Sequence, residues 1–167
     1  ANEGLGSEDK VYLATNPLSA DAFATQIPAL EARGAWIKHP RGESVIKPPT
    51  IVTFEDANLE AVVRDSINKP EGDILLTNVL ELTELSAANK NIRSLSGIES
   101  LTGLKELDLF DNQISDLKPL SSLSRLTRLN LNDNQISDLT PLSSLNTLTG
   151  IGLSNNQISD LKPLSNL

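Results

Sequence analysis

The sequence contains neither cysteine nor methionine, and aromatic residues make up only 3% of its 167 positions. The absence of cysteine excludes disulfides, thiol nucleophiles and zinc–cysteine sites. Because no methionine is present, we expect the chain to be a processed product or a fragment that does not begin at a natural start. With so few aromatic rings, a core has to be built from leucine, isoleucine, valine and alanine.

Positive charge and long apolar runs are also scarce. The net charge is −8, which disfavours nucleic acid and anionic membranes as partners. No stretch approaches 18 consecutive apolar residues, so we expect no membrane insertion. Common nucleotide-binding, metalloprotease and serine-hydrolase motifs are missing, and His39 is the single histidine. We therefore expect a non-catalytic chain with no cofactor and no metal site.

The sequence does contain one motif that occurs three times with small variations. "DNQISDLKPLSSL" begins at Asp111, "DNQISDLTPLSSL" at Asp133 and "NNQISDLKPLSNL" at Asn155, at a constant spacing of 22 residues. Aligned on the leucines, the chain forms the blocks 79–100, 101–122, 123–144 and 145–166, of which the first is degenerate. Leu167 would open another block, so we expect the array to be truncated there.

Each block predicts one coil of a stacked array. The alternation Leu107-x-Leu109 predicts a short strand with both leucines directed inward. Asn112 follows it, and we interpret its amide as a partner for backbone groups in the turn. Pro119 permits a turn or a short 3₁₀ segment and forbids a long helix. One coil buries too little apolar surface to stand alone, so the coils have to stack and complete each other's core.

The pattern L-x-x-L-x-L-x-x-N-x-I with a 22-residue period resembles leucine-rich repeats, and "ISDLKPLSSL" resembles the bacterial internalin-like class. The resemblance covers residues 79–167. It implies an α/β solenoid, a right-handed superhelix with a parallel concave β-sheet, a convex side of 3₁₀ segments and turns, and a helical N-terminal cap.

Residues 52–78 fit the cap. "FEDANLEAVVRDSIN" has Asp56 as a candidate N-cap, followed by apolar residues on one helical face. These apolar residues are Leu59, Val62, Val63 and Ile67. A membrane-bound amphipathic helix is the rival interpretation, but the opposite face is acidic, which disfavours it.

The segment before the cap carries its own fragment of a repeat. In residues 1–38, Val11, Leu13 and Asn16 stand at the strand-and-asparagine spacing, and "AWIKH" predicts a further strand. We interpret 1–38 as the end of a preceding leucine-rich array with its C-terminal flank. Residues 39–51 contain three prolines and one glycine, which predicts an extended linker without a core of its own. Alternatively, residues 1–50 pack against the cap.

Acidic residues recur at one position of the repeat, namely at Asp116, Asp138 and Asp160. Stacked carboxylates are potential Ca²⁺ ligands, but no D-x-D-x-D loop accompanies them. We favour a role in which each carboxylate accepts backbone N–H bonds in its own turn.

The strand positions directed away from the core differ between blocks, while the leucine positions stay the same, so they are free to contact a partner. The candidate contact residues are Glu84, Ser86, Glu106, Asp108, Phe110, Arg128, Asn130, Asn132 and Ser154. Phe110 is the only aromatic residue of the repeats and is either a contact anchor or a cover for its neighbours' side chains. Gly150 and Gly152 leave the fourth strand without outward side chains. This either admits the backbone of a partner or reflects random sequence drift.

These observations and the resemblance imply a protein–protein interaction module that binds a protein partner through its concave face. By resemblance to internalin-like proteins, we expect an exported or cell-surface bacterial protein, with a cytoplasmic location as the alternative. A second hypothesis is a repeat or spacer segment of a larger multidomain enzyme, such as a repeat-fused GTPase or hydrolase, whose catalytic part lies outside this chain. Glycan binding is a third, disfavoured by the scarcity of aromatic platforms.

Overall fold

A computed structural model describes residues 10–12, 36–38, 45–46 and 49–165. The chain divides into two compact units, Ala1–Thr50 and Ile51–Leu167. Most of the fragmentary repeat in the first unit, and His39, lie outside the described residues.

The first unit contains a three-stranded sheet of β1 (Lys10–Tyr12), β2 (Trp36–Lys38) and β3 (Val45–Ile46). β1 and β2 are parallel, and β2 and β3 are antiparallel. The strand expected from "AWIKH" is therefore present as β2. β3 falls inside the segment expected to be an unpaired linker, where the β-branched pair of residues favours strand pairing. The domain boundaries given above stay predictions.

The second unit opens with the cap. Ile51 forms an antiparallel bridge with Leu75, and the Val52 N–H donates to the Ile74 carbonyl at 2.7 Å. Helix α2 (Ala57–Ser66) follows, and the short helix α3 (Leu76–Val79) leads into the repeats. α2 begins where its sequence predicts, because the side chain of its N-cap residue accepts the first free backbone N–H groups.

The apolar face of α2 is buried as its spacing predicts. Leu59, Val62 and Val63 are in the core, and Ile67 is half-buried at the C-cap. On the other side, Arg64 pairs with Glu60 one turn earlier at 2.8 Å. The helix therefore covers one end of the apolar column with its apolar side and faces solvent with charge.

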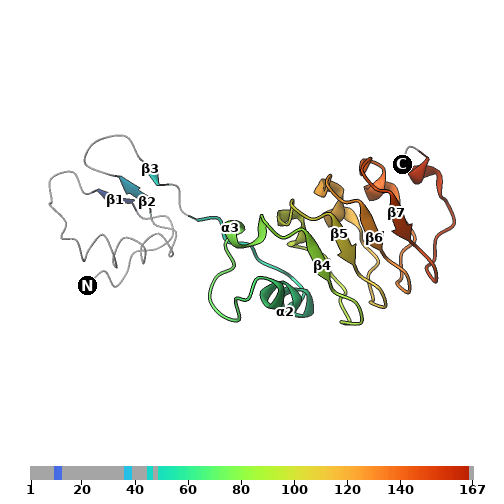
Figure 1. Cartoon of the computed structure of the whole chain (residues 1–167), viewed down its shortest axis with the longest axis horizontal. Coiled ribbons are helices and arrows are strands. Elements are labelled where there is room, and N and C mark those ends of the chain that lie inside the picture. The colour runs from blue at the N-terminus through green and yellow to red at the C-terminus, as the bar shows by residue number, and fades with distance from the viewer. Residues whose placement is uncertain (1–9, 13–35, 39–44, 47–48, 166–167) are drawn as a thin grey trace. The chain divides into compact units, whose positions relative to one another are not determined.

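Four parallel strands form the sheet of the repeats, in the order β4–β5–β6–β7 (Figure 1). Their bounds are Glu84–Ser86 for β4, Glu106–Asp108 for β5, Arg128–Asn130 for β6 and Gly150–Gly152 for β7. Residues 22 apart stand side by side in the ladder, as with Leu107 and Leu129. The repeat period thus fixes the register, and the predicted parallel solenoid is confirmed.

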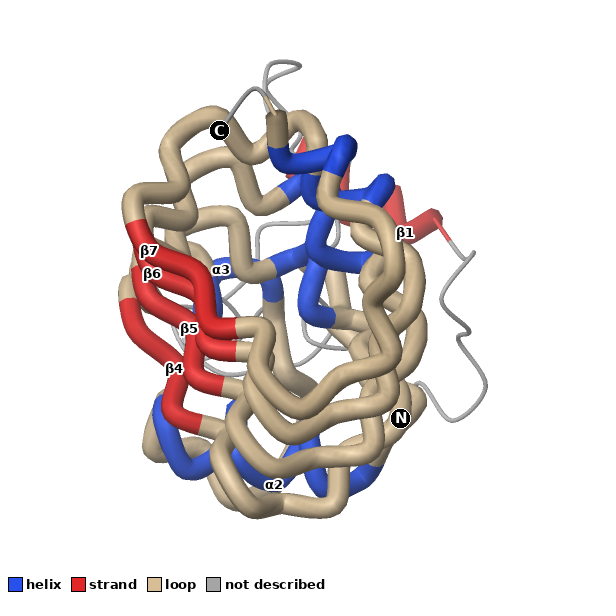
Figure 2. Tube along the Cα trace, turned by 90° about the vertical axis from the view of Figure 1, so that its right-hand side faces the viewer, coloured by secondary structure: helices blue, strands red, loops and turns tan. Residues whose placement is uncertain are grey.

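The opposite side of each coil is a 3₁₀ segment. These segments are η2 (Ile98–Ser100), η3 (Lys118–Ser122), η4 (Thr140–Leu142) and η5 (Lys162–Leu164). In the last three, proline stands in the first turn, where its missing N–H costs nothing. Figure 2 looks along the array and shows the strands stacked on one wall of the coils, with the 3₁₀ segments stacked on another.

The leucine and isoleucine columns of the repeats form one continuous core with the cap. The last coil differs beyond Leu148, because its remaining apolar side chains are only partly covered and Leu161 is 62% exposed. The repeat pattern predicts Leu161 in the core, and this prediction is wrong: no described coil packs on its outer side. In the described part of the chain, no helix has the length and apolar character needed to cross a membrane.

Candidate functional site

The repeated asparagine is a structural element of the coil. The Asn134 side chain accepts the backbone N–H of Ile114 at 3.0 Å through Oδ1 and donates through Nδ2 to the carbonyls of Leu109, Leu131 and Asn132. Asn112 and Asn156 make the same kind of contacts one coil before and one coil after. A side chain fully engaged with backbone has no capacity left for a ligand, so the predicted structural role is confirmed.

The aspartates of the repeat close turns. Oδ1 of Asp116, Asp138 and Asp160 accepts the backbone N–H two residues later, at 2.9, 2.8 and 2.9 Å. Hydrogen bonding to Thr140 lowers the pKa of Asp138 below its ordinary value. These contacts confirm the turn-closing role favoured over a calcium ladder.

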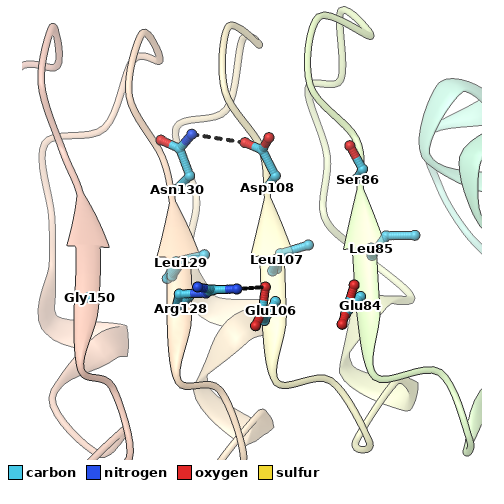
Figure 3. Close-up of a pocket in the computed structure, with 10 residues that line it drawn as sticks. All are labelled: Glu84, Leu85, Ser86, Glu106, Leu107, Asp108, Arg128, Leu129, Asn130 and Gly150. Carbon is cyan, nitrogen blue, oxygen red and sulfur yellow. Dashed lines mark hydrogen bonds and ion pairs between the residues drawn. The ribbon is translucent and has the colours of Figure 1, made fainter.

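The side of the sheet that faces away from the core, called the sheet face below, holds a hollow of about 370 Å³ that crosses all four strands (Figure 3). Side chains directed outward from β4, β5 and β6 surround it, and β7 contributes bare backbone. The lining residues are Glu84, Leu85, Ser86, Glu106, Leu107, Asp108, Arg128, Leu129, Asn130 and Gly150. The leucines among them are buried on the core side and hold the strands in place.

Two contacts between neighbouring strands organise this hollow. Arg128 forms a hydrogen-bonded ion pair with Glu106, and the hydrogen bond and charge of Glu106 raise the pKa of Arg128. Nδ2 of Asn130 donates to Oδ1 of Asp108 at 2.9 Å, and the same oxygen accepts the Phe110 N–H at 3.1 Å. Figure 3 shows the Arg128 guanidinium directed toward Glu106 and the Asn130 amide nitrogen directed toward Asp108. The space beside Gly150 of β7 is therefore open.

The two glycines of β7 differ in their surroundings. A Cβ on Gly152 would lie 2.7 Å from Asn132 Nδ2 and 2.8 Å from Asn130 Oδ1. A Cβ on Gly150 would meet only Cγ of Arg128, at 4.0 Å. A side chain at position 152 would thus displace two hydrogen-bonded amides, whereas a side chain at position 150 would displace nothing.

The comparisons with known proteins agree with this geometry. A family model described as "Leucine Rich repeats (2 copies)" matches residues 81–122 and 124–166, which is about half of the chain. The chain belongs to the leucine-rich repeat family. A comparison with curated proteins found no match.

Two solved structures from Listeria monocytogenes are similar to this leucine-rich repeat chain. An internalin (inlF) is 35% identical over 71% of this chain and 36% of its own, with a TM-score of 0.68. The functional domain of InlJ, which includes a cysteine ladder, is 30% identical over 65% of this chain and 24% of its own, with a TM-score of 0.61. The chain is therefore a bacterial internalin-like protein that spans about a third of the first relative and a quarter of the second. This chain contains no cysteine.

The sheet face brings together most of the contact residues predicted from the sequence. Six of the nine line the hollow, and three, Phe110, Asn132 and Ser154, do not. Phe110 is half-buried beyond the end of β5, where its carbonyl accepts the Asn89 N–H at 2.9 Å. Asn132 Oδ1 accepts the Ser154 N–H at 2.7 Å, so this hydrogen bond joins two neighbouring coils. Partner binding by any of the nine stays a prediction.

Sequence reasoning did not separate Gly150 from Gly152, and it did not explain Asp111 and Asp133. These two aspartates have φ values of 51° and 57°, in the left-handed region, and Asn155 has the same conformation. Asparagine and aspartate tolerate this region better than other non-glycine residues. This position of the repeat is occupied by Asp or Asn in all three copies, and that restriction was the available signal for a left-handed turn.

Proposed function

We propose that the array is a non-catalytic module that binds a protein partner through its sheet face. The hollow that crosses β4 to β7 supports this proposal most directly. Its walls carry charged and amide side chains on a sheet held rigid by the leucine columns behind it. Preorganised polar groups on a rigid concave surface lower the entropic cost of association.

The module works within an exported or cell-surface bacterial protein in this proposal. Support comes from the similarity to internalins. The net charge of −8 also suits a protein that has to avoid nonspecific contact with acidic polymers. The alternative, a repeat segment of a larger enzyme, remains a prediction that sequence flanking this chain tests: a nucleotide-binding or hydrolase motif there would favour it.

Site-specific photo-crosslinking tests the binding face. A photoreactive amino acid replaces Ser86 on the sheet face or, as the matched control, Ser121 on η3, and the chain is mixed with a pool of extracellular proteins. We expect one protein to be captured from position 86 and not from 121. Adding Asp108→Arg or Phe110→Ala to the Ser86 probe should weaken that capture. Because Asp108 also accepts the Asn130 and Phe110 N–H groups, melting curves check that each variant is still folded at the temperature of the assay. Equal capture from both positions would contradict the assignment of the sheet face.

A further inference from the structure

The charges of the sheet face are not balanced within the chain. Glu84 and Glu106 are register partners on β4 and β5, and like charges directly opposite each other destabilise a strand pair. Arg128 pairs with Glu106 from the other side. Among the described residues, Glu84 has neither an ion-pair nor a side-chain hydrogen-bond partner. The charge of Glu84 therefore acts on Arg128 only from a distance, where it helps to raise the pKa of the guanidinium, and has no contact partner of its own.

Asp108 adds a third carboxylate, and its recorded partners are neutral. The Asn130 amide and the Phe110 N–H donate to its Oδ1, which orients the group without cancelling its charge. The face thus carries three carboxylates and one guanidinium, and that guanidinium is already engaged. The negative potential of this surface attracts cationic groups, and it would steer a partner with a positive patch toward the sheet face.

Gly150 is a second, independent feature of the same hollow. Glycine inside a strand lowers stability, and it often marks a place where a ligand or another backbone approaches closely. The space above Gly150 is open, and no contact inside the chain requires a glycine there, in contrast to Gly152. Gly150 is the register partner of Arg128, which pairs with Glu106, which in turn pairs with Glu84. The open space above Gly150 therefore lies in the same row across the sheet as these three charged side chains.

We propose that the sheet face takes a basic segment of a protein partner, which inserts a lysine or arginine side chain between Glu84 and Glu106 and lays its backbone over Gly150. This assignment rests on the proposed function and specifies the chemistry of the partner. Four strands spaced about 4.8 Å apart put Glu84 and Gly150 about 14 Å from each other. An extended chain covers that distance in about four residues, so the basic residue stands about four positions from the residue over Gly150.

Selection of peptides from a displayed random 12-residue library on the full chain tests the proposal. We expect the selected peptides to be enriched in lysine and arginine relative to the starting library. Synthetic versions should bind more weakly as salt rises, because salt screens exposed charges. Glu84→Lys and Gly150→Leu should each weaken binding about tenfold or more, through repulsion and through filled space respectively. Asp65→Lys, the same charge change at an exposed position of α2, should leave affinity unchanged.

The outcomes separate this inference from the function on which it rests. Peptides that bind, are blocked by Gly150→Leu, show no basic enrichment and ignore Glu84→Lys would overturn the basic partner and keep the sheet face as a binding site. Absence of any selected peptide, or binding that is insensitive to both sheet substitutions, would overturn the inference and count against the function as well. Melting curves for each variant check that the fold is retained.

Discussion

Oδ2 of Asp56 accepts the backbone N–H of Arg93 at 2.7 Å, although the two residues are 37 positions apart. Oδ1 of the same carboxylate caps α2 by accepting the N–H groups of Asn58 and Leu59 at 2.9 and 3.3 Å. One side chain therefore both begins the cap helix and ties it to the first coil. Partial burial acts to raise the pKa of Asp56, but the backbone hydrogen bonds outweigh it and lower the pKa below 3.8.

Asp56→Asn should lower the free energy of unfolding by about 1 kcal/mol at neutral pH. Asparagine keeps an oxygen for the helix cap but presents an amide N–H₂ to the Arg93 N–H. Because the folded-state pKa is lowered, the contribution of Asp56 is complete above its unfolded-state pKa and is lost as pH falls through its folded-state pKa. Urea unfolding at pH 7 and near pH 3 should therefore show the two proteins converging in acid. Asp65→Asn, on the exposed face of α2, is the control and should change stability at pH 7 by less than about 0.5 kcal/mol.

Asn134→Ala should lower the free energy of unfolding by about 2–4 kcal/mol. The substitution leaves the buried Ile114 N–H without a partner and removes one of the two amide donors of the Leu109 carbonyl, of which only Asn112 remains. Asn146→Ala, at an exposed position outside the ladder, should change stability by less than about 0.5 kcal/mol. Chemical denaturation followed by circular dichroism measures both, and equal effects would contradict the importance of the ladder.

Leu129→Asp should unfold the neighbouring repeats, because it places an unpaired charge in the leucine column. Leu161→Asp makes the same chemical change at a leucine that is 62% exposed and should be tolerated. Thermal melting distinguishes the two variants. A normal transition for Leu129→Asp would show that the assigned core does not hold the array together.

Gly150→Ala and Gly152→Ala should have opposite effects on stability. Alanine at position 150 meets open space and removes a flexible glycine from a strand, so we expect a gain of about 0.5–1 kcal/mol. Alanine at position 152 displaces the side chains of Asn130 and Asn132 and disturbs their bonds to Asp108 and the Ser154 N–H, at a cost of about 1–2 kcal/mol. Destabilisation by both substitutions in urea titrations would mean that Gly150 also has a structural role.

The parts of the fold that repeat in the sequence were predictable, and the parts that depend on single contacts were not. A fixed period of 22 residues determines the strand register and the position of Asn134, because every coil faces the same neighbours. Leu161 has the same sequence context, but no described coil lies on its outer side, and the repeat pattern does not predict this difference. The half-buried setting of Phe110 and the crowding around Gly152 likewise depend on side chains of the adjacent coil.

The asparagine ladder gives the array a direction. Each asparagine completes the turn of the coil that precedes it, as when Asn156 accepts the Ile136 N–H and donates to the Leu131 carbonyl. Every described coil except the last is therefore fixed by the coil that follows it, while the cap end is fixed separately through Asp56. Loss of structure should accordingly begin at the coil of Ile158 and move toward the helix one coil at a time, with slow-exchanging amides surviving longest beside α2.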